Sequence, residues 1–124
     1  MLVTGVDIIE IKRIKSAVER WGCRFLRRVY TEDELTYCKG RAPSLAARFA
    51  AKEATMKALG TGIRGIGWRD IEVVRPRGKA PCLCLHGKAA QKARALGIRN
   101  LALSLSHSKD YAVASVVGWR EAPP

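Results

Sequence analysis

Residues 44–59 read SLAARFAAKEATMKAL, and this alanine-rich stretch decides the fold. Pro43 stands near its start and Gly60 directly follows its end, and these are the positions that helix termini favour for proline and glycine. The pattern therefore predicts one long helix over residues 44–59.

The chain before this helix is expected to begin with a strand and continue as shorter helices. Leu2–Val6 is short and β-prone. From Ile8 onward, apolar residues recur at three- and four-residue steps, which predicts a helix that is interrupted at Gly22. Residues 31–38 open with a threonine–glutamate capping box, so a third, short helix is predicted there.

The chain after the long helix is expected to be mostly extended. A glycine-rich segment over residues 60–67 predicts a mobile loop. Strands are predicted at 70–75, 82–86, 101–106 and 111–117, with a basic helix at 87–96. Helices early and antiparallel strands late predict an α+β fold, with an antiparallel sheet packed against the long helix. We expect one domain over residues 1–119 and a frayed tail over residues 120–124.

The net charge points to an anionic partner. The 124 residues include 23 Lys and Arg against 11 Asp and Glu, a net charge of +12. Such a field attracts nucleic acid, phosphorylated small molecules or an acidic protein. A nucleic-acid-binding protein is the main rival interpretation, but only 6% of the residues are aromatic and no RNA- or DNA-binding motif occurs.

Composition also indicates the compartment. The sequence has no apolar run near the roughly 20 residues that span a bilayer. Met1–Glu10 carries no basic leader. The four cysteines form no C-x-x-C pair and are expected to be reduced structural thiols, and His86 is likewise taken as structural. We expect a cytoplasmic protein without a membrane partner.

Two carboxylates suggest metal chemistry. Glu53 and Lys57 are four residues apart, so on periodicity alone an exposed ion pair between them is the simplest interpretation. Asp7, however, follows the first predicted strand in a chain with few acids. Asp7 and Glu53 together offer oxygen ligands to a hard cation such as Mg²⁺, which often completes its shell with substrate phosphates. A module that only binds its ligand needs no such pair.

His107 is the third candidate for the site. It directly follows a predicted strand, and histidines in turns are usually ordinary surface residues. Preceded by Ser106 and followed by Lys109, it is also suited to donate a hydrogen bond to a phosphate oxygen.

Three segments together resemble a known family. GVDIIEIKRI at 5–14, RFAAKEATMKALGTG at 48–62 and SLSHSKDYAVASVV at 104–117 are similar to the holo-(acyl-carrier-protein) synthases, the short class of 4′-phosphopantetheinyl transferases. The resemblance implies transfer of the 4′-phosphopantetheine arm of coenzyme A to a serine of apo acyl carrier protein. The second product is adenosine 3′,5′-bisphosphate, and the reaction serves fatty acid biosynthesis.

The resemblance also implies roles for particular residues. Asp7 and Glu53 match the Mg²⁺ ligands of the family. The residues expected near the coenzyme A phosphates are Arg48, Lys52, Lys57, Ser106 and His107, of which Lys57 and His107 are counted with Glu53 as catalytic. The proton of the attacking serine goes either to Glu53 or to a metal-bound water. We favour the water, because a carboxylate that coordinates a cation is a weakened base.

The family further implies a homotrimer with sites at subunit boundaries, so that His107 faces the two carboxylates across a seam. It also implies that an acidic carrier protein docks on the first helix. If that helix continues past Gly22, its arginines lie on the side opposite its apolar stripe. The simpler interpretation of such a charged side is a solvent-exposed face without a partner. The expected docking residues are Arg13, Arg20 and Arg24, with Arg27 beside them.

Overall fold

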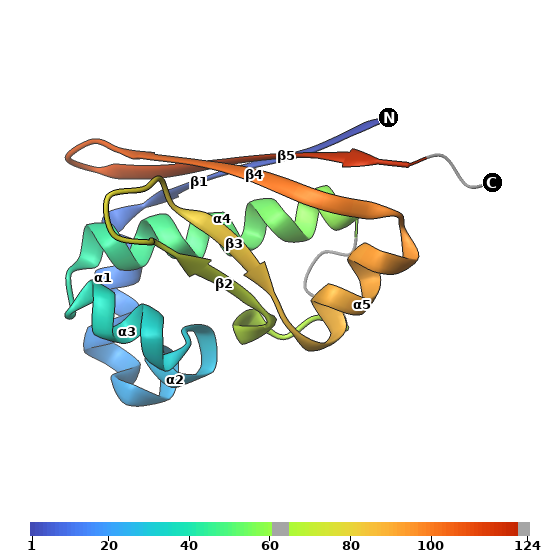
Figure 1. Ribbon diagram of the computed structural model, residues 1–124. Helices are drawn as coiled ribbons and strands as arrows, with labels where there is room; N and C mark the ends of the chain where they lie inside the picture. Colours follow the sequence, from blue (N-terminus) through green and yellow to red (C-terminus); the bar gives the residue numbers. More distant parts are fainter. Residues whose placement is uncertain (61–64, 122–124) are drawn as a thin grey trace.

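A three-stranded antiparallel sheet and one long helix organise the molecule (Figure 1). The computed structural model describes residues 1–60 and 65–121. In the larger sheet, β5 (Tyr111–Arg120) lies between β1 (Leu2–Glu10) and β4 (Ile98–His107). A separate antiparallel pair is formed by β2 (Ile71–Val74) and β3 (Cys82–Leu85).

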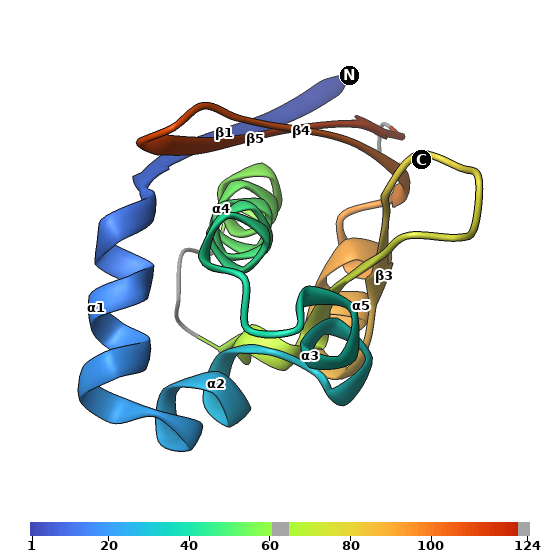
Figure 2. The ribbon, with the colours of Figure 1, turned by 90° about the vertical axis from the view of Figure 1, so that its left-hand side faces the viewer.

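The helices surround the inner face of the larger sheet. Their bounds are α1 Ile11–Trp21, α2 Cys23–Val29, α3 Glu32–Cys38, α4 Ala42–Leu59 and α5 Gly87–Ala95, with a 3₁₀ turn, η1, at Trp68–Asp70. Figure 2 shows α4 directly beneath the sheet, with α1 on one side and β3 with α5 on the other. The predicted α+β class, with an antiparallel sheet against a long helix, is confirmed.

The central position of α4 explains its alanines. Ala50, Ala51 and Ala54 are fully buried, so their small side chains let the neighbouring elements approach the helix closely. The tightest approach is at Gly5 of β1, where a Cβ atom would lie 1.8 Å from the backbone oxygen of Ala54. A side chain at position 5 is therefore excluded unless β1 moves away from α4.

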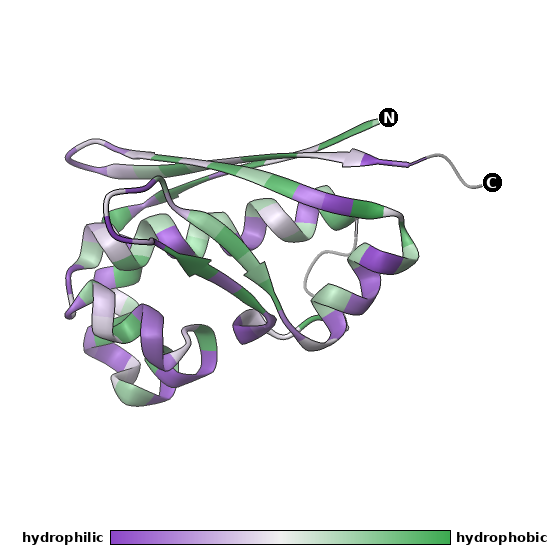
Figure 3. Cartoon of the chain, viewed as in Figure 1, coloured by the Kyte–Doolittle hydropathy of each residue, from purple (hydrophilic) through white to green (hydrophobic). Residues whose placement is uncertain are grey.

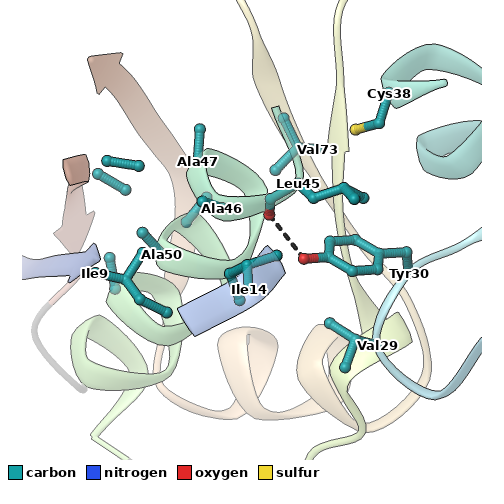
Figure 4. Close-up of a cluster of buried hydrophobic side chains, with 14 of the residues drawn as sticks. Ile9, Ile14, Val29, Tyr30, Cys38, Leu45, Ala46, Ala47, Ala50 and Val73 are labelled. Atoms are coloured by element: carbon teal, nitrogen blue, oxygen red, sulfur yellow. Dashed lines mark hydrogen bonds between the residues drawn. The ribbon is translucent and has the colours of Figure 1, made fainter. Parts of the chain in front are cut away.

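A polar anchor fixes the helical end of the core. Tyr30, which is fully buried, donates a hydrogen bond of 2.7 Å to the backbone oxygen of Leu45 (Figure 4). Burial raises the pKa of the Tyr30 phenol far above its usual value, so this group remains a donor. The bond holds the α2–α3 junction against the first turn of α4.

The prediction that a helix begins near Ile8 is wrong. Strand β1 continues to Glu10, and Asp7, Ile8 and Ile9 all pair with β5. Ile9 is buried beneath the sheet while Ile8 is 64% exposed on its other side, which is the alternation of a strand. Pairing with β5 decides the structure here, because a β-branched pair such as Ile8–Ile9 suits a strand as well as a helix.

One further boundary agrees with the sequence-based expectation, and one differs. The expected break at Gly22 is confirmed, with φ of 54° ending α1. The chain does not fray at Arg120, because the backbone nitrogen of Arg120 donates to Met1 and that of Glu121 donates to Gly97. Residues 61–64 of the predicted glycine-rich loop and residues 122–124 of the tail lie outside the described residues.

The outer face of the larger sheet is apolar and open. Its exposed side chains alternate with the buried ones that face α4. They include Leu2, Val6, Ile8, Tyr111, Val117 and Trp119, each between 39% and 64% exposed. Figure 3 shows hydrophobic residues recurring along these strands, and no helix in residues 1–60 or 65–121 covers this face.

No helix within residues 1–60 and 65–121 is long and apolar enough to cross a membrane.

Candidate functional site

The two predicted carboxylates come together in space. Asp7 is on β1 and Glu53 is on α4, and both line one pocket of about 280 Å³. Arg13 of α1 and the ring of Phe49 complete the charged and apolar sides of that pocket. The close contact of Gly5 with Ala54 brings the two carboxylates together. Asp7 lies two residues after Gly5 on the same face of β1, and Glu53 immediately precedes Ala54 on α4.

The electrostatics show that the two carboxylates interact. Burial, the negative charge of Asp7 and a hydrogen bond with Asp7 raise the pKa of Glu53, while Lys57 and Arg13 act in the opposite direction. Like charges held close together in a partly buried site disfavour each other's charged form, so a positive species between the two carboxylates is favoured.

Lys57 completes the cluster, but not in the way that helical spacing suggests. Its ammonium lies 3.1 Å from Asp7 Oδ1 and donates to the backbone oxygen of Val6 at 2.9 Å. The ion pair expected between Glu53 and Lys57 is replaced by this one across the strand–helix contact. The side chain of Lys57 remains 54% exposed, so its charge also reaches the solvent-facing side of the site.

The cluster fits a divalent cation. Two carboxylates supply hard oxygen ligands, and Mg²⁺ is commonly held by one or two carboxylates and several waters. Burial, and after it the charge of Asp7, raises the pKa of Glu53, and a cation between the two carboxylates would favour the charged form of both. The donor set of Asp7 and Glu53 therefore suits Mg²⁺.

Lys52 does not belong to this cluster, which corrects the expectation that it lies near phosphates. It is fully buried, and its ammonium donates to Glu34 Oε1 at 2.7 Å and to the backbone oxygens of Trp68 and Ile71. Glu34 is itself fully enclosed and accepts from the backbone nitrogens of Thr31 and Val73. Lys52 is a structural residue that joins α4 to α3 and β2.

Arg48 lies on the same side of α4 as Lys52. It is 4% exposed, and its guanidinium lies 4.1 Å from the centre of the Tyr37 ring. Among the described residues its Nε has no hydrogen-bond partner. Within one chain, the structure does not bring Arg48 to the acidic pair.

His107 is also apart from the acidic pair within one chain. It ends β4 opposite Ala112 of β5, which in turn pairs with Ile9 of β1. Two strand spacings therefore separate it from β1, a lateral distance of about 10 Å. His107 is exposed on the α4 side of the sheet, and Ser106 is exposed on the outer face.

The basic surface of the first two helices differs in detail from the expected one. The break at Gly22 separates Arg13 and Arg20 on α1 from Arg24 on α2. Arg24 lines a second pocket with Trp21, Phe25 and Arg28. Arg13 instead lines the acidic pocket, a role that sequence inspection missed.

Comparison with known proteins identifies the family of the chain. A family model described as the 4′-phosphopantetheinyl transferase superfamily matches residues 4–116. The holo-[acyl-carrier-protein] synthase of Herpetosiphon aurantiacus is 58% identical over 125 residues, which covers 95% of this chain and 98% of that protein.

Solved structures show the same fold. The holo-[acyl-carrier-protein] synthase of Helicobacter pylori in complex with coenzyme A has a TM-score of 0.85 at 35% identity, covering 94% of this chain and 99% of that one. The enzyme of the same name from Neisseria meningitidis has a TM-score of 0.87 at 34% identity, covering 95% and 98%. The chain therefore belongs to the 4′-phosphopantetheinyl transferase superfamily, in the group that contains the holo-[acyl-carrier-protein] synthases.

Proposed function

We propose that the protein transfers the 4′-phosphopantetheine arm of coenzyme A to a serine of apo acyl carrier protein, with Mg²⁺ held by Asp7 and Glu53. The observation that carries this proposal is the meeting of two carboxylates beside Lys57 and Arg13. The coenzyme A complex of the Helicobacter pylori relative supports the choice of donor.

The reaction needs a base that removes the serine proton and positive charge that neutralises the leaving phosphate. The serine oxygen forms a bond to the β-phosphorus of the coenzyme A pyrophosphate, and the bond from that phosphorus to the bridging oxygen breaks. The serine gives its proton to a base at the site, either Glu53 or a water, and adenosine 3′,5′-bisphosphate leaves with the bonding electrons. Mg²⁺ supplies Lewis-acid stabilisation of the pyrophosphate charge when it is bound.

The side chains of this chain provide the remaining charge. The half-exposed ammonium of Lys57 offers a fixed positive group beside Asp7, where it is suited to contact a phosphate oxygen. Arg13 adds a second cation at the mouth of the same pocket. We assign His107 to the phosphates as well, from a neighbouring subunit, because β5 lies between its strand and the strand of Asp7 in its own chain.

The open sheet face supports the proposed homotrimer. Single chains rarely leave a contiguous apolar patch of this kind uncovered, and such patches usually mark protein contacts. Self-association through the face that carries Leu2, Val6, Ile8, Val117 and Trp119 would cover it.

Placing a charge on that face is expected to separate the subunits. Val117, 39% exposed on the central strand, becomes buried in the proposed contact, so Val117→Asp introduces an unpaired buried charge. We expect Val117→Asp to sediment as a monomer without transfer activity, whereas the wild type sediments as a trimer. Lys88→Asp on exposed α5 is the control that changes charge elsewhere. A trimeric Val117→Asp variant would contradict this assignment of the face.

The basic surface of α1 and α2 is the proposed docking site for the carrier protein. Arg20 and Arg24 are exposed, and Arg24 and Arg28 flank an apolar pocket formed by Trp21 and Phe25. Arginine pairs with carboxylates through two parallel hydrogen bonds, which suits an acidic partner.

Charge reversal on this surface is expected to act on one substrate only. Arg20→Glu with Arg24→Glu should raise the KM for carrier protein about tenfold or more, a change of about 1.4 kcal/mol, and leave the KM for coenzyme A unchanged. Arg13 is left intact because it lines the acidic pocket. Lys88→Glu with Lys92→Glu on α5 is the matched control, and added salt should weaken wild-type docking. Equal effects on both KM values would argue against a docking role.

We assign the reaction to fatty acid biosynthesis in the cytoplasm. All four cysteines are free thiols, and Cys23, Cys82 and Cys84 are exposed, which suits a reducing compartment.

Mass spectrometry tests the proposed activity directly. Apo acyl carrier protein, coenzyme A, Mg²⁺ and the enzyme are incubated together, and the carrier protein should gain one phosphopantetheine group. Binding of coenzyme A without any mass change in the carrier protein would instead indicate a module without turnover.

A further inference from the structure

A second cluster of metal-ligating side chains lies on the small β2–β3 sheet (Figure 1). Glu72 of β2 is directly opposite Cys84 of β3, and His86 follows that strand. Each of the three offers one ligand atom, and these atoms lie within 4.8 Å of one another. None of them belongs to the pocket of Asp7 and Glu53.

The strand register produces this convergence. Paired residues on antiparallel strands project to the same face, so the Glu72 carboxylate and the Cys84 thiol lie side by side. Leu83 and Leu85 project to the opposite face and pack against the cores. The nearly buried carboxylate of Glu72 therefore faces two exposed, movable ligands, Cys84 and His86.

One pair of ligand atoms is already close to tetrahedral spacing. His86 Nε2 lies 3.0 Å from Glu72 Oε1, and the Cys84 sulfur lies within 4.8 Å of both. Ligands bound at about 2.0 Å in a tetrahedron are separated by about 3.3 Å, so the first pair needs a shift of a few tenths of an ångström and the thiol must turn towards them. The exposed side chains of Cys84 and His86 can make that shift without disturbing the core.

The carboxylate is already oriented as a ligand. The Thr31 hydroxyl donates a 2.6 Å hydrogen bond to Glu72 Oε2, which leaves Oε1 directed at His86. Burial acts to raise the pKa of Glu72, but the hydrogen bonds from Thr31 and His86 outweigh it and hold the pKa below the usual carboxyl value. Such outer hydrogen bonds commonly orient metal ligands.

We propose that Glu72, Cys84 and His86 form a binding site for Zn²⁺, with a fourth position open to solvent. A thiolate, an imidazole and a carboxylate are the ligand types that zinc prefers, whereas Mg²⁺ takes oxygen ligands. On binding, Cys84 releases its proton to solvent, and the metal takes the place of any proton on His86 Nε2, which passes to Nδ1 or to solvent. The ion ties β3 to β2 and, through Thr31, to the start of α3.

Cobalt substitution gives the test a visible signal. Zn²⁺ is spectroscopically silent, whereas Co²⁺ bound to a thiolate shows a sulfur-to-metal charge-transfer band. Titration of the full chain with Co²⁺ should produce this band at one equivalent, and added Zn²⁺ should remove it. We expect Cys84→Ser to abolish the band and His86→Gln or Glu72→Gln to weaken Co²⁺ binding by at least about tenfold.

Cys82→Ser is the matched control, since Cys82 is exposed on the same strand and the same face, two residues away. It should leave both the band and the affinity unchanged. A band that survives in Cys84→Ser, or one that is insensitive to His86→Gln, would overturn the proposal and indicate adventitious thiol binding only.

Thermal unfolding provides a second readout. Saturating Zn²⁺ should raise the wild-type Tm relative to a chelator-treated sample by roughly 5 °C or more, because a ligand that binds only the folded state stabilises it. Cys84→Ser should show no such rise, and an equal rise in that variant would contradict the site. The proposal is independent of the transfer reaction, and its failure would leave the Asp7–Glu53 account unchanged.

Discussion

Phosphopantetheine transfer is expected to fall by at least about a thousandfold in the Glu53→Gln variant, while the fold is retained. A metal ion contributes several kcal/mol to transition-state stabilisation, and each 1.4 kcal/mol corresponds to about a factor of ten in rate. Glu53 is only partly buried and lies outside both cores, so its replacement leaves the packing in place. Steady-state assays with carrier protein and far-ultraviolet circular dichroism measure the two effects. Asp7→Asn should behave in the same way.

Stability distinguishes a functional carboxylate from a structural one. The pKa of Glu53 is raised in the folded state, so the folded state binds the carboxyl proton more tightly than the unfolded state does. The stability of the fold therefore falls as the pH rises from the unfolded-state pKa of Glu53 through its higher folded-state pKa. Without metal at neutral pH, Glu53→Gln removes this cost. We expect the free energy of unfolding to rise by less than about 1 kcal/mol, because the group is screened by solvent, and Tm to rise slightly.

The matching control is Glu19→Gln, an exposed acid on α1. It should alter neither activity nor Tm. The wild-type activity should also decline on the acid side as Glu53 takes up its proton. Full activity in Glu53→Gln would contradict the metal assignment.

The largest effect on stability is expected for Lys52→Met. Lys52 and Glu34 form an ion pair with both side chains fully buried, and the substitution leaves the Glu34 carboxylate in the core without its cation. Removing one partner of a buried pair typically costs about 3–5 kcal/mol. Urea unfolding followed by fluorescence should show a lower midpoint with an unchanged slope.

A double variant separates the ion pair from simple loss of packing. Adding Glu34→Gln to Lys52→Met removes the uncompensated charge, so we expect part of the lost stability to return. Glu34 also accepts from Thr31 and Val73, so the recovery should be incomplete. A single variant as stable as the wild type would show that the pair contributes no net stability.

Local sequence patterns predicted the elements whose signals are local. Three features were recognisable from the sequence: the alanine-rich α4, the capping box of Thr31 with Glu34 and the break at Gly22. Helix propensity, capping and the positive φ of a glycine each depend on only a few neighbouring residues. The extension of β1 to Glu10 was not recognisable. It depends on pairing with β5, more than a hundred residues later, which no local pattern records.

The contacts of the charged side chains of α4 also depend on distant parts of the chain, which local patterns do not record. Helical spacing suggested that Glu53 pairs with Lys57, and the family resemblance implied that Lys52 lies near phosphates; tertiary contacts give both lysines other partners. Lys57 reaches across to Asp7, and Lys52 is enclosed by α3 and β2. Spacing fixes which residues share a face of a helix, whereas the elements packed against that face decide what each charge meets.

Calorimetric titration of coenzyme A, with and without Mg²⁺, tests the central claim that Asp7 and Glu53 jointly hold the cation. The account predicts that Mg²⁺ strengthens coenzyme A binding to the wild type and has no effect on the Asp7→Asn, Glu53→Gln double variant, which keeps its fold. An equal Mg²⁺ effect in the double variant would contradict it.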